Sequence, residues 1–371
     1  MNKKFFISPT GYLIYAICLL LTAGCSEDVS SEQPDSAPII LFTTKGMPTT
    51  RATTPIVPSD YEQFSEGAVL GVFAYNANNG IENLGQPDLL YNGTLTKTTI
   101  EDITSYQSNP AVHWPTATGK VYFAAYYPHN SSIADGAILL SSSVWSGRPE
   151  FTVELGIEHG KMDFAVAEVG PITPAYDATN EGDSIQRESN YVNFLFYRKL
   201  SEISFRAKTT NTTPLTKLYI NSISIRNIYK KGTYKMEEKA WTLPKGEEVD
   251  GISGATLKLG NNGSPVSEGD FKYVMNPNAA SARDASVVMI PQKYSNVELD
   301  VTYTIEYLKA AGGCEYRIIG TKKVPLTVDW HPGRLYVYDI EFGFFEAENE
   351  KTNFLFHVKP WNSKDISTEI N

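Results

Sequence analysis

The chain has 371 residues, 42 of them acidic and 32 basic, so its formal net charge at neutral pH is −10. An acidic surface repels phosphate backbones, which excludes nucleic acid as an expected partner. Of the three cysteines, Cys18 and Cys25 lie near the amino terminus and only Cys314 lies in the body of the chain. No internal disulfide is therefore expected there, and stability must come from a buried core.

Residues 1–24 have the three parts of a secretory signal: Lys3 and Lys4, an apolar stretch over residues 11–21, and small residues before Cys25. The apolar stretch is too short to span a bilayer as a stable helix. The segment resembles a bacterial lipoprotein signal peptide, which is cut before a cysteine that receives fatty acyl chains. We therefore expect lipidation at Cys25 and anchoring in the outer membrane. The alternative is an ordinary signal cut nearby, with a free Cys25.

Residues 25–37 are polar and contain proline, and we expect them to form a flexible linker between the lipid and the folded part. Glu27 and Asp28 resemble the acidic tag that sends some lipoproteins to the outer face of the outer membrane. Together these features predict a protein displayed on the cell surface.

Beyond residue 37 the chain is rich in tyrosine and phenylalanine and is punctuated by glycine and proline, which is typical of an all-β protein. The clearest strand covers residues 297–307, where apolar and polar side chains alternate with period two. Residues 335–344 and 354–358 repeat this alternation. No window has the pattern of a long amphipathic helix, so the sheets must cover one another, as in a β-sandwich. The side chains of 297–307 that we expect to face the core are Val297, Leu299, Val301, Tyr303, Ile305 and Tyr307.

Two local irregularities carry further predictions. Leu218 and Ile220 lie on even numbers, whereas Ile223 and Ile225 lie on odd ones, so a β-bulge is needed between the pairs if all four are to face inward. The sequence WHPGR reads as a turn in which Gly333 takes the left-handed conformation.

A polar stretch over residues 171–190 interrupts the strand pattern near the middle of the chain. We take it as a domain boundary that divides the folded part into an amino-terminal domain, 38–185, and a carboxyl-terminal domain, 186–371. Each has a size that suits one domain.

The sequence contains no local motif of a catalytic, metal-binding or phosphate-binding site. The five histidines are scattered and none belongs to a zinc pattern, so no metal site is predicted. Nucleophile elbows and phosphate-binding loops are absent as well. Cys314 has no identifiable partner histidine, and we expect it to be a small buried apolar residue. No catalytic residue, cofactor or enzymatic activity is predicted.

Several short motifs, taken in order, resemble the fimbrillin family, the subunits and accessory proteins of type V pili in Gram-negative anaerobes. They extend over nearly the whole chain after the linker. The motifs are AVLGVFAYN at 68–76, HWP at 113–115, VYFAAYYP at 121–128, MDFAVAE at 162–168, VNFLFYRKLSEISFR at 192–206, IYKKGTY at 228–234, VVMIPQ at 287–292, WHPGRLYVYDI at 330–340, and Trp361.

The resemblance implies two transthyretin-like β-sandwich domains in tandem and a structural or adhesive role. In pilin-type members an Arg-specific protease removes the first strand, and a strand of another subunit fills the vacated groove. Applied here, the displaced strand is PIILFTTK at 38–45, with Ile39, Ile40, Leu41 and Phe42 at its centre. The segment FLFHVKPW at 354–361 could act as the donor, or it could be a permanent strand of the carboxyl-terminal domain.

Cleavage is expected between Arg51 and Ala52, in a segment rich in proline and threonine that a protease could reach. The alternatives are that Arg51 is a solvated loop residue without a role, and that the first strand is retained, as it is in anchor and accessory members. The triplets around Ser36 and Ser184 resemble acceptor motifs for O-linked glycans.

The leading hypothesis is a fimbrial subunit or fimbria-associated lipoprotein at the cell surface, whose partners are other fimbrial subunits and a possible host or glycan ligand. A second hypothesis is a surface β-sandwich lipoprotein that binds polysaccharide for an uptake system. Glycan binding would require planar aromatic side chains exposed in loops, whereas a pilin buries them in strands. A third hypothesis, a hydrolase, would require a carboxylate pair that the sequence alone does not reveal.

Overall fold

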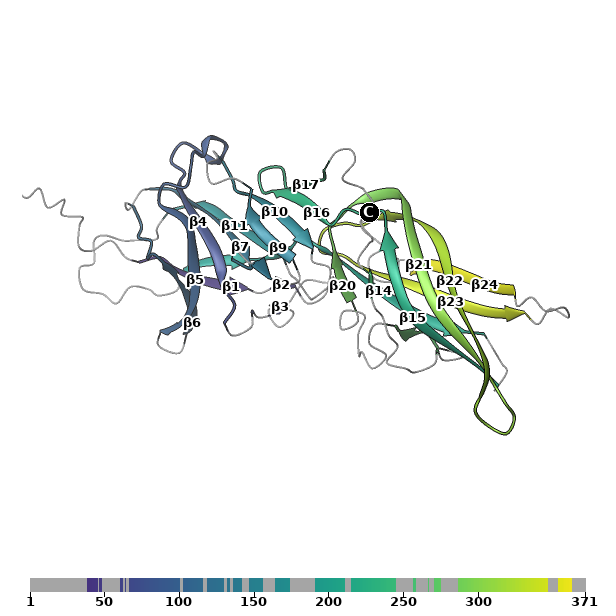
Figure 1. The fold of residues 1–371 in the computed structure, drawn as a ribbon. Coiled ribbons are helices and arrows are strands. Elements are labelled where there is room, and N and C mark those ends of the chain that lie inside the picture. Colours follow the sequence, from purple (N-terminus) through teal and green to yellow (C-terminus); the bar gives the residue numbers. More distant parts are fainter. Residues whose placement is uncertain are drawn as a thin grey trace, which may run out of the picture. The chain divides into compact units, whose positions relative to one another are not determined.

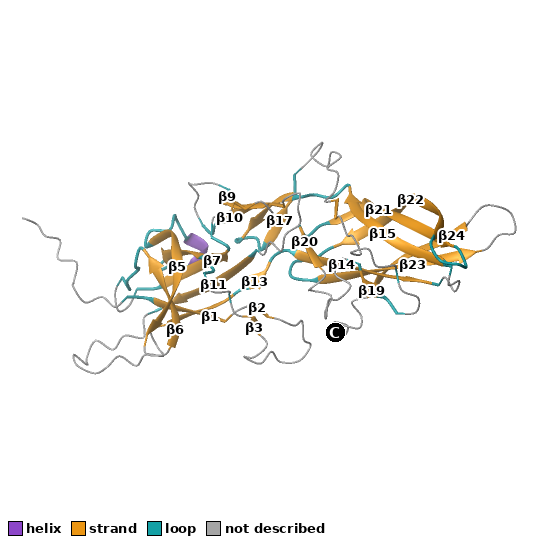
Figure 2. Ribbon diagram, turned by 60° about the horizontal axis from the view of Figure 1, so that its bottom comes forward, coloured by secondary structure: helices purple, strands orange, loops and turns teal. Residues whose placement is uncertain are grey.

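The computed structural model describes the following parts of the chain: 39–45, 47–48, 61–62, 64, 67–100, 103–115, 119–129, 132–133, 136–141, 147–155, 164–173, 191–210, 215–244, 256–257, 266, 270–274, 286–345 and 353–361. Strands dominate these residues (Figure 1), and the helix among them is one 3-10 turn, Ile81–Asn83. Figure 2 separates the strands from the connecting loops by colour. The predicted all-β class is confirmed.

The largest sheet has eight strands in the order β12-β1-β6-β5-β4-β7-β11-β13. Its members are β1 (Leu41–Lys45), β4 (Leu70–Asn76), β5 (Leu90–Ile100), β6 (Ile103–Asn109), β7 (Val121–Tyr127), β11 (Ala165–Ile172), β12 (Tyr191–Leu195) and β13 (Tyr197–Arg198). The central strands β4 and β7 are buried on both faces. This double burial explains why VYFAAYY is apolar throughout rather than alternating.

A second sheet of five strands has the order β17-β16-β10-β9-β8. These strands are β8 (Ser132–Ile133), β9 (Gly136–Leu140), β10 (Glu150–Leu155), β16 (Lys231–Lys235) and β17 (Ala240–Thr242). In the antiparallel pair of β10 and β16, Phe151 lies opposite Tyr234. The chain therefore returns to this sheet after it has entered the sheets described next. A separate two-stranded ladder joins β2 (Met47–Pro48) and β3 (Tyr61–Glu62).

The remaining strands form a third and a fourth sheet. The third contains β19 (Lys272–Tyr273), β14 (Ser201–Thr209), β23 (Leu335–Phe345) and β24 (Asn353–Trp361), with β20 (Ser286–Met289) also paired to β14. The fourth has the order β18-β15-β21-β22, formed by β18 (Thr256–Leu257), β15 (Thr216–Arg226), β21 (Lys293–Leu308) and β22 (Cys314–Asp329). Tyr303 of β21 contacts Phe342 of β23, with ring centroids 6.0 Å apart, so the two sheets share a core.

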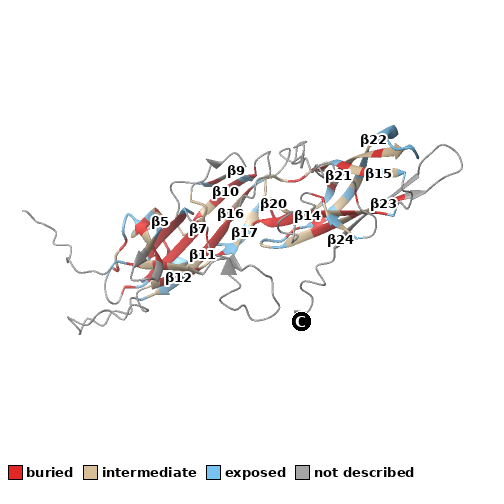
Figure 3. Ribbon diagram, turned by 90° about the horizontal axis from the view of Figure 1, so that it is seen from below, coloured by how far each residue is buried: buried red, intermediate tan, exposed pale blue. Residues whose placement is uncertain are grey.

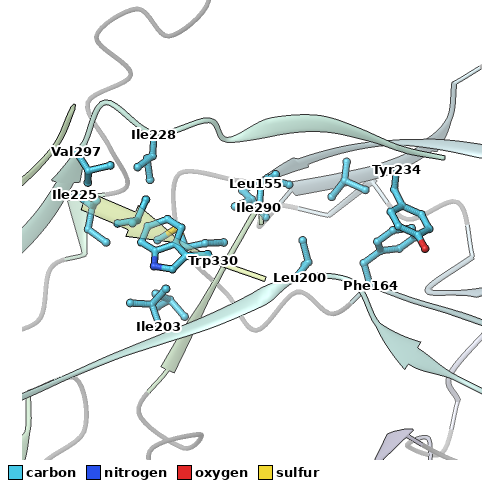
Figure 4. Close-up of a cluster of buried hydrophobic side chains, with 14 of the residues drawn as sticks. Leu155, Phe164, Leu200, Ile203, Ile225, Ile228, Tyr234, Ile290, Val297 and Trp330 are labelled. Carbon is cyan, nitrogen blue, oxygen red and sulfur yellow. The ribbon is translucent and has the colours of Figure 1, made fainter. Parts of the chain in front are cut away.

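Buried apolar side chains gather in two clusters. One lies on the face of the eight-stranded sheet that carries Phe42, Val72 and Phe123. The other begins on its opposite face, includes Phe151 of the second sheet, and continues into the core between the third and fourth sheets. Figure 4 shows part of this second cluster, where Trp330 lies among Ile203, Ile225 and Val297.

The predicted bulge in β15 is confirmed. The antiparallel register with β21 shifts between Ile220 and Ser222, which leaves Asn221 as the additional residue. Leu218, Ile220, Ile223 and Ile225 are all buried as a result. One inserted residue thus brings both apolar pairs to the same face of a strand that would otherwise have to expose one pair.

The turn and the strands around it also follow the prediction. Gly333 has a φ of 65°, in the left-handed region that glycine tolerates best, and β23 begins two residues later. Within β23 the side chains of Tyr338, Ile340 and Phe342 are buried, whereas Tyr336 is half-buried. In β21 the register is as predicted, with Ile305 fully buried.

Two burial predictions were wrong. Tyr303 and Tyr307 are only half-buried, and the phenol ring of Tyr303 extends over Gly320 of the edge strand β22. Cys314 is exposed rather than buried, because it stands at the first position of β22, directly after the hairpin turn and beyond the part of the sheet that the other strands cover.

Candidate functional site

The first strand, β1, lies inside the eight-stranded sheet rather than at its edge. It pairs with β12 in parallel over five residues and with β6 in antiparallel orientation, where Phe42 is opposite Tyr106. Just before β1, the amide of Ile40 donates a hydrogen bond to the carbonyl of Val112 at 2.9 Å, and Ile39 forms an isolated bridge with His113. The strand thus occupies a slot between two neighbours.

Two side chains of the first strand fill the space beneath it. Ile40 and Phe42 are completely buried. The ring of Phe42 stacks on Phe194 of β12 at 5.5 Å and meets Phe123 of β7 edge-on at the same distance. Trp114 closes this aromatic group, 6.2 Å from Phe123 and perpendicular to it. Burying an isoleucine and a phenylalanine side chain stabilises the strand by roughly 2 to 3 kcal/mol each.

The other residues predicted at the centre of the displaced strand face outward. Ile39 is 41% exposed and Leu41 is half-buried. Thr43 is half-buried and donates a side-chain hydrogen bond to Oδ1 of Asn193 in β12. Alternation therefore divides the strand into an apolar inner face and an outer face that carries polar side chains.

This arrangement is suited to binding an extended peptide segment. Without β1, the facing edges of β6 and β12 would have unpaired backbone groups, and Phe123 and Phe194 would lose their contacts with Phe42. A strand that replaced β1 would restore both ladders through its backbone and would need a large apolar side chain at the position of Phe42. Main-chain ladders supply affinity in such recognition, and side-chain pockets supply specificity.

The sequence indicates some of the residues that line this slot, but it does not indicate the strand pairing that forms it. The motif HWP, which contributes to the family resemblance, contains Trp114, and this side chain is buried beside Phe123. The pairing of β1 with β12 was not predicted, because nothing in the sequence marks two distant strands as parallel neighbours. The period-two pattern of VNFLF was the available signal that Val192 and Phe194 face one side.

Other predicted site residues lie outside the described part of the chain: Cys25, Ser36, Arg51, Ala52 and Ser184. The proposed donor segment is described as β24, which pairs with β23 in antiparallel orientation over nine residues, from Val337 opposite Trp361 to Phe345 opposite Asn353. In this structure the segment is a strand of the third sheet.

A partly buried network of charged and polar side chains lies elsewhere, near the second sheet. Nε of Arg148 is 2.9 Å from both the hydroxyl of Tyr122 and Oε1 of Glu168, and its NH1 lies 2.8 Å from Glu237. Tyr122 also donates a hydrogen bond to Glu168. Burial raises the pKa of Tyr122 far above its usual range, and the neighbouring carboxylate of Glu168 raises it further. Every charge here has a partner, so the group reads as a structural link among β7, β11 and the turn after β16.

Within the described residues, no three histidine, cysteine, aspartate or glutamate side chains come close enough together to hold a metal ion. No helix in that same part of the chain has the length and apolar character needed to cross a membrane.

The chain is similar to a known protein family and to several solved structures. The model of the fimbrillin-like family matches residues 50–361. No curated protein sequence matches the chain. A fimbrial protein from Bacteroides vulgatus is 17% identical with a TM-score of 0.50, over 79% of this chain and 93% of its own. The fimbrial anchor protein Mfa2 from Porphyromonas gingivalis is 9% identical with a TM-score of 0.34, over 88% of this chain and 98% of its own. The similarity to the Bacteroides vulgatus protein shows that the two chains share a fold.

Proposed function

The chain belongs to the fimbrillin-like family, and we propose that it is a fimbrial subunit or fimbria-associated lipoprotein of the cell surface that assembles by exchange of its first strand. The observation that carries the proposal is the position of β1. It is an inner strand, held on both sides by ladders, whose apolar face is filled by Ile40 and Phe42. A strand of that kind can be exchanged only for another extended strand, because any other occupant leaves the backbone groups of β6 and β12 unpaired.

The sequence of events that we propose begins with a lipidated precursor anchored through Cys25. In that precursor β1 covers its own slot and keeps the open edges from pairing with neighbouring molecules. Cleavage between Arg51 and Ala52 then separates β1 covalently from the rest of the domain. An extended terminal segment of the next subunit replaces it, and 354–361 has the required period-two sequence.

The donor segment has a competing place in the monomer. Because 353–361 pairs with β23 over nine residues, it must leave that ladder before it can enter the slot of a neighbour. The segment loses one set of main-chain hydrogen bonds and forms another. Which of the two sites it occupies therefore depends on the side chains that each site buries. We further propose that the folded part comprises two transthyretin-like domains, 38–185 and 186–371, with β12, β13, β16 and β17 of the second segment completing the sheets of the first.

The distribution of aromatic side chains supports a structural role over polysaccharide binding. The largest of the almost completely buried side chains in the described part of the chain are all tyrosine or phenylalanine. The exposed aromatic residues of the described part are Tyr91, Tyr197 and Tyr316, and each lies in a strand rather than in a loop.

The test uses the processed chain from residue 25 onward with Cys25→Ser, which keeps it free of lipid. Treatment with an Arg-specific protease should create a new amino terminus at Ala52 and, with time, a ladder of oligomers on mild gels. Arg51→Ala should give neither product. An internal control is Arg206, which is held by Asp339 at 2.7 Å in a paired strand and should stay uncut.

Two results would count against the proposal in different ways. A protein that is not cut at Ala52 retains its first strand, which contradicts the cleavage step. A protein that is cut there, releases the fragment and still forms no ladder of oligomers at high concentration contradicts strand exchange itself.

A further inference from the structure

The long hairpin of β21 and β22 has an edge that no other strand of the described residues pairs with. β22 is the last strand of the fourth sheet, and in the described part of the chain its ladder partner is β21. From Cys314 to Lys323 every residue of β22 except the half-buried Gly320 is exposed (Figure 3). This portion therefore presents free backbone groups along one side and open side chains on both faces.

Three large apolar side chains are concentrated in this portion. Tyr316 is 51% exposed, Ile318 is 36% exposed and Ile319 is 71% exposed, the highest exposure of a large apolar residue in the described chain. A strand edge with such side chains is a template for pairing with another strand. The lysines and proline usual at such edges are confined to the far end of this portion and beyond, at Lys322, Lys323 and Pro325.

We propose that β22 is a homodimerisation edge, and that it pairs in antiparallel orientation with β22 of a second copy of this chain about a two-fold axis at Ile319. In an antiparallel pair that continues one sheet, directly opposed residues share a face, so residue numbers in each pair must both be odd or both be even. An axis through Ile319 satisfies this condition. It produces one continuous sheet across the two molecules.

This register is selected by charge complementarity. It places Glu315 opposite Lys323 of the second copy, and the same pair recurs on the other side of the axis. Tyr316 then lies opposite Lys322, an arrangement that favours a cation–π contact. Arg317 faces the neutral Thr321, and Pro325, which cannot donate to a ladder, lies outside the nine paired residues.

Neighbouring registers are less favourable. An axis at Arg317 would oppose two copies of that arginine, and an axis at Gly320 would oppose Arg317 and Lys323. An axis at Tyr316 would pair only Cys314 to Ile318, since β22 begins at Cys314. An axis at Ile318 would oppose Glu315 and Thr321 and would form no charge pair. Like charges directly opposed across strands are destabilising, whereas opposite charges are favourable.

The register also places Ile319, the most exposed large apolar side chain, at the centre of the interface, where it is removed from water. Ile319 of one copy meets Ile319 of the other at the centre of the interface. Arg317 is already bound to Glu306 at 2.7 Å and Lys323 to Glu298 at 2.8 Å, so the outer face of each hairpin enters the contact with its charges partly neutralised. A second copy thus fits this edge in charge and backbone pairing.

The test is site-directed disulfide formation in the chain from residue 25 onward. Cys25→Ser and Cys314→Ser remove the native thiols, and Arg51→Ala prevents cleavage, so that strand exchange cannot contribute. In this background Ile319→Cys should yield a disulfide-linked dimer under mild oxidation. The matched control is Thr321→Cys, on the same face. Its two copies would lie about 13 Å apart along the strands, beyond disulfide reach, and should stay monomeric.

Sedimentation provides a second readout that needs no thiol. The background protein should associate to dimers as its concentration rises, and Ile319→Lys should remain monomeric with an unchanged unfolding midpoint, because the side chain is exposed. Equal disulfide yields at positions 319 and 321, or an Ile319→Lys protein that dimerises as well as its parent, would overturn the proposal.

Discussion

The rings of Phe42 and Phe194 stack 5.5 Å apart at an interplanar angle of 7°, which joins the first strand of the fold to a strand more than a hundred residues further along the chain. Both side chains are completely buried. This contact makes Phe42 the principal side-chain anchor of β1, and the first prediction concerns its removal.

Phe42→Ala should lower the free energy of unfolding by about 3 to 5 kcal/mol, because it leaves a cavity among Phe123, Phe194 and Trp114. Urea denaturation followed by tryptophan fluorescence measures this loss. The control is Thr43→Ala, at a half-buried position on the outer face of the same strand, which should cost much less. Similar losses for the two variants would mean that the inner and outer faces of β1 have been assigned wrongly.

The bulge at Asn221 provides a second prediction. Deleting this residue removes the extra position between Ile220 and Ser222, so one of the two apolar pairs in β15 must turn outward. We expect a loss of several kcal/mol, comparable with the removal of two core side chains. Asn221→Ala keeps the bulge and gives up only a hydrogen bond to Thr304, so it should cost about 1 kcal/mol or less. Comparable denaturation midpoints for the deletion and the parent would contradict the role of the bulge.

The third prediction concerns alkaline stability. Burial raises the pKa of Tyr338 to about 12, and its hydroxyl accepts a hydrogen bond from Nε1 of Trp330 at 2.9 Å. A tyrosine whose pKa is higher in the folded state than in the unfolded state contributes stability that is fully present below about pH 10 and is lost as the pH rises towards 12. Over that window the loss approaches about 3 kcal/mol.

Tyr338→Phe separates this effect from the rest of the protein. Below pH 10 the variant should be less stable than the parent by about 1 to 3 kcal/mol, since Trp330 loses its acceptor. Between pH 10 and 12 the difference should shrink, because only the parent has this phenol to ionise and the other tyrosines titrate in both proteins. Stability curves that stay parallel over this window would contradict the burial assigned to the hydroxyl.

Cys25→Ala tests the membrane attachment. The variant should be released from the cell envelope and should take up no label from a radioactive fatty acid, whereas the parent should be labelled and retained. The Cys314→Ser protein, which keeps Cys25, serves as the matched control. Label retained by Cys25→Ala would show that the lipid is attached elsewhere or that the signal has been read wrongly.

The strand content and several core positions could be predicted from local sequence, because period-two alternation reports directly on which side chains face inward. The bulge in β15 was visible as a change of phase, and Gly333 was visible as a turn residue. These features depend on a few neighbouring residues only, so a single sequence is sufficient to find them.

Features that depend on pairing between distant strands were not accessible in this way. Nothing local indicates that β1 lies between β6 and β12, or that residues 231–235 pair with β10 in the second sheet. The exposure of Cys314 was missed for a related reason, since the end of an edge hairpin has the composition of a strand but lacks a covering layer. The slot beneath Phe42 therefore emerged only once the sheets were assembled.

The central claim, that β1 is the strand that is exchanged, is tested most directly by locking it in place. Thr43 of β1 lies opposite Asn193 of β12 in register, and their side chains are in contact. In the chain from residue 25 onward with Cys25→Ser and Cys314→Ser, the pair Thr43→Cys and Asn193→Cys should form a reversible disulfide across the slot. After cleavage at Ala52 we predict no oligomers larger than a dimer while the disulfide is intact, and a ladder of larger oligomers once a reductant is added. Oligomers that form equally well with the disulfide closed would contradict exchange of the first strand.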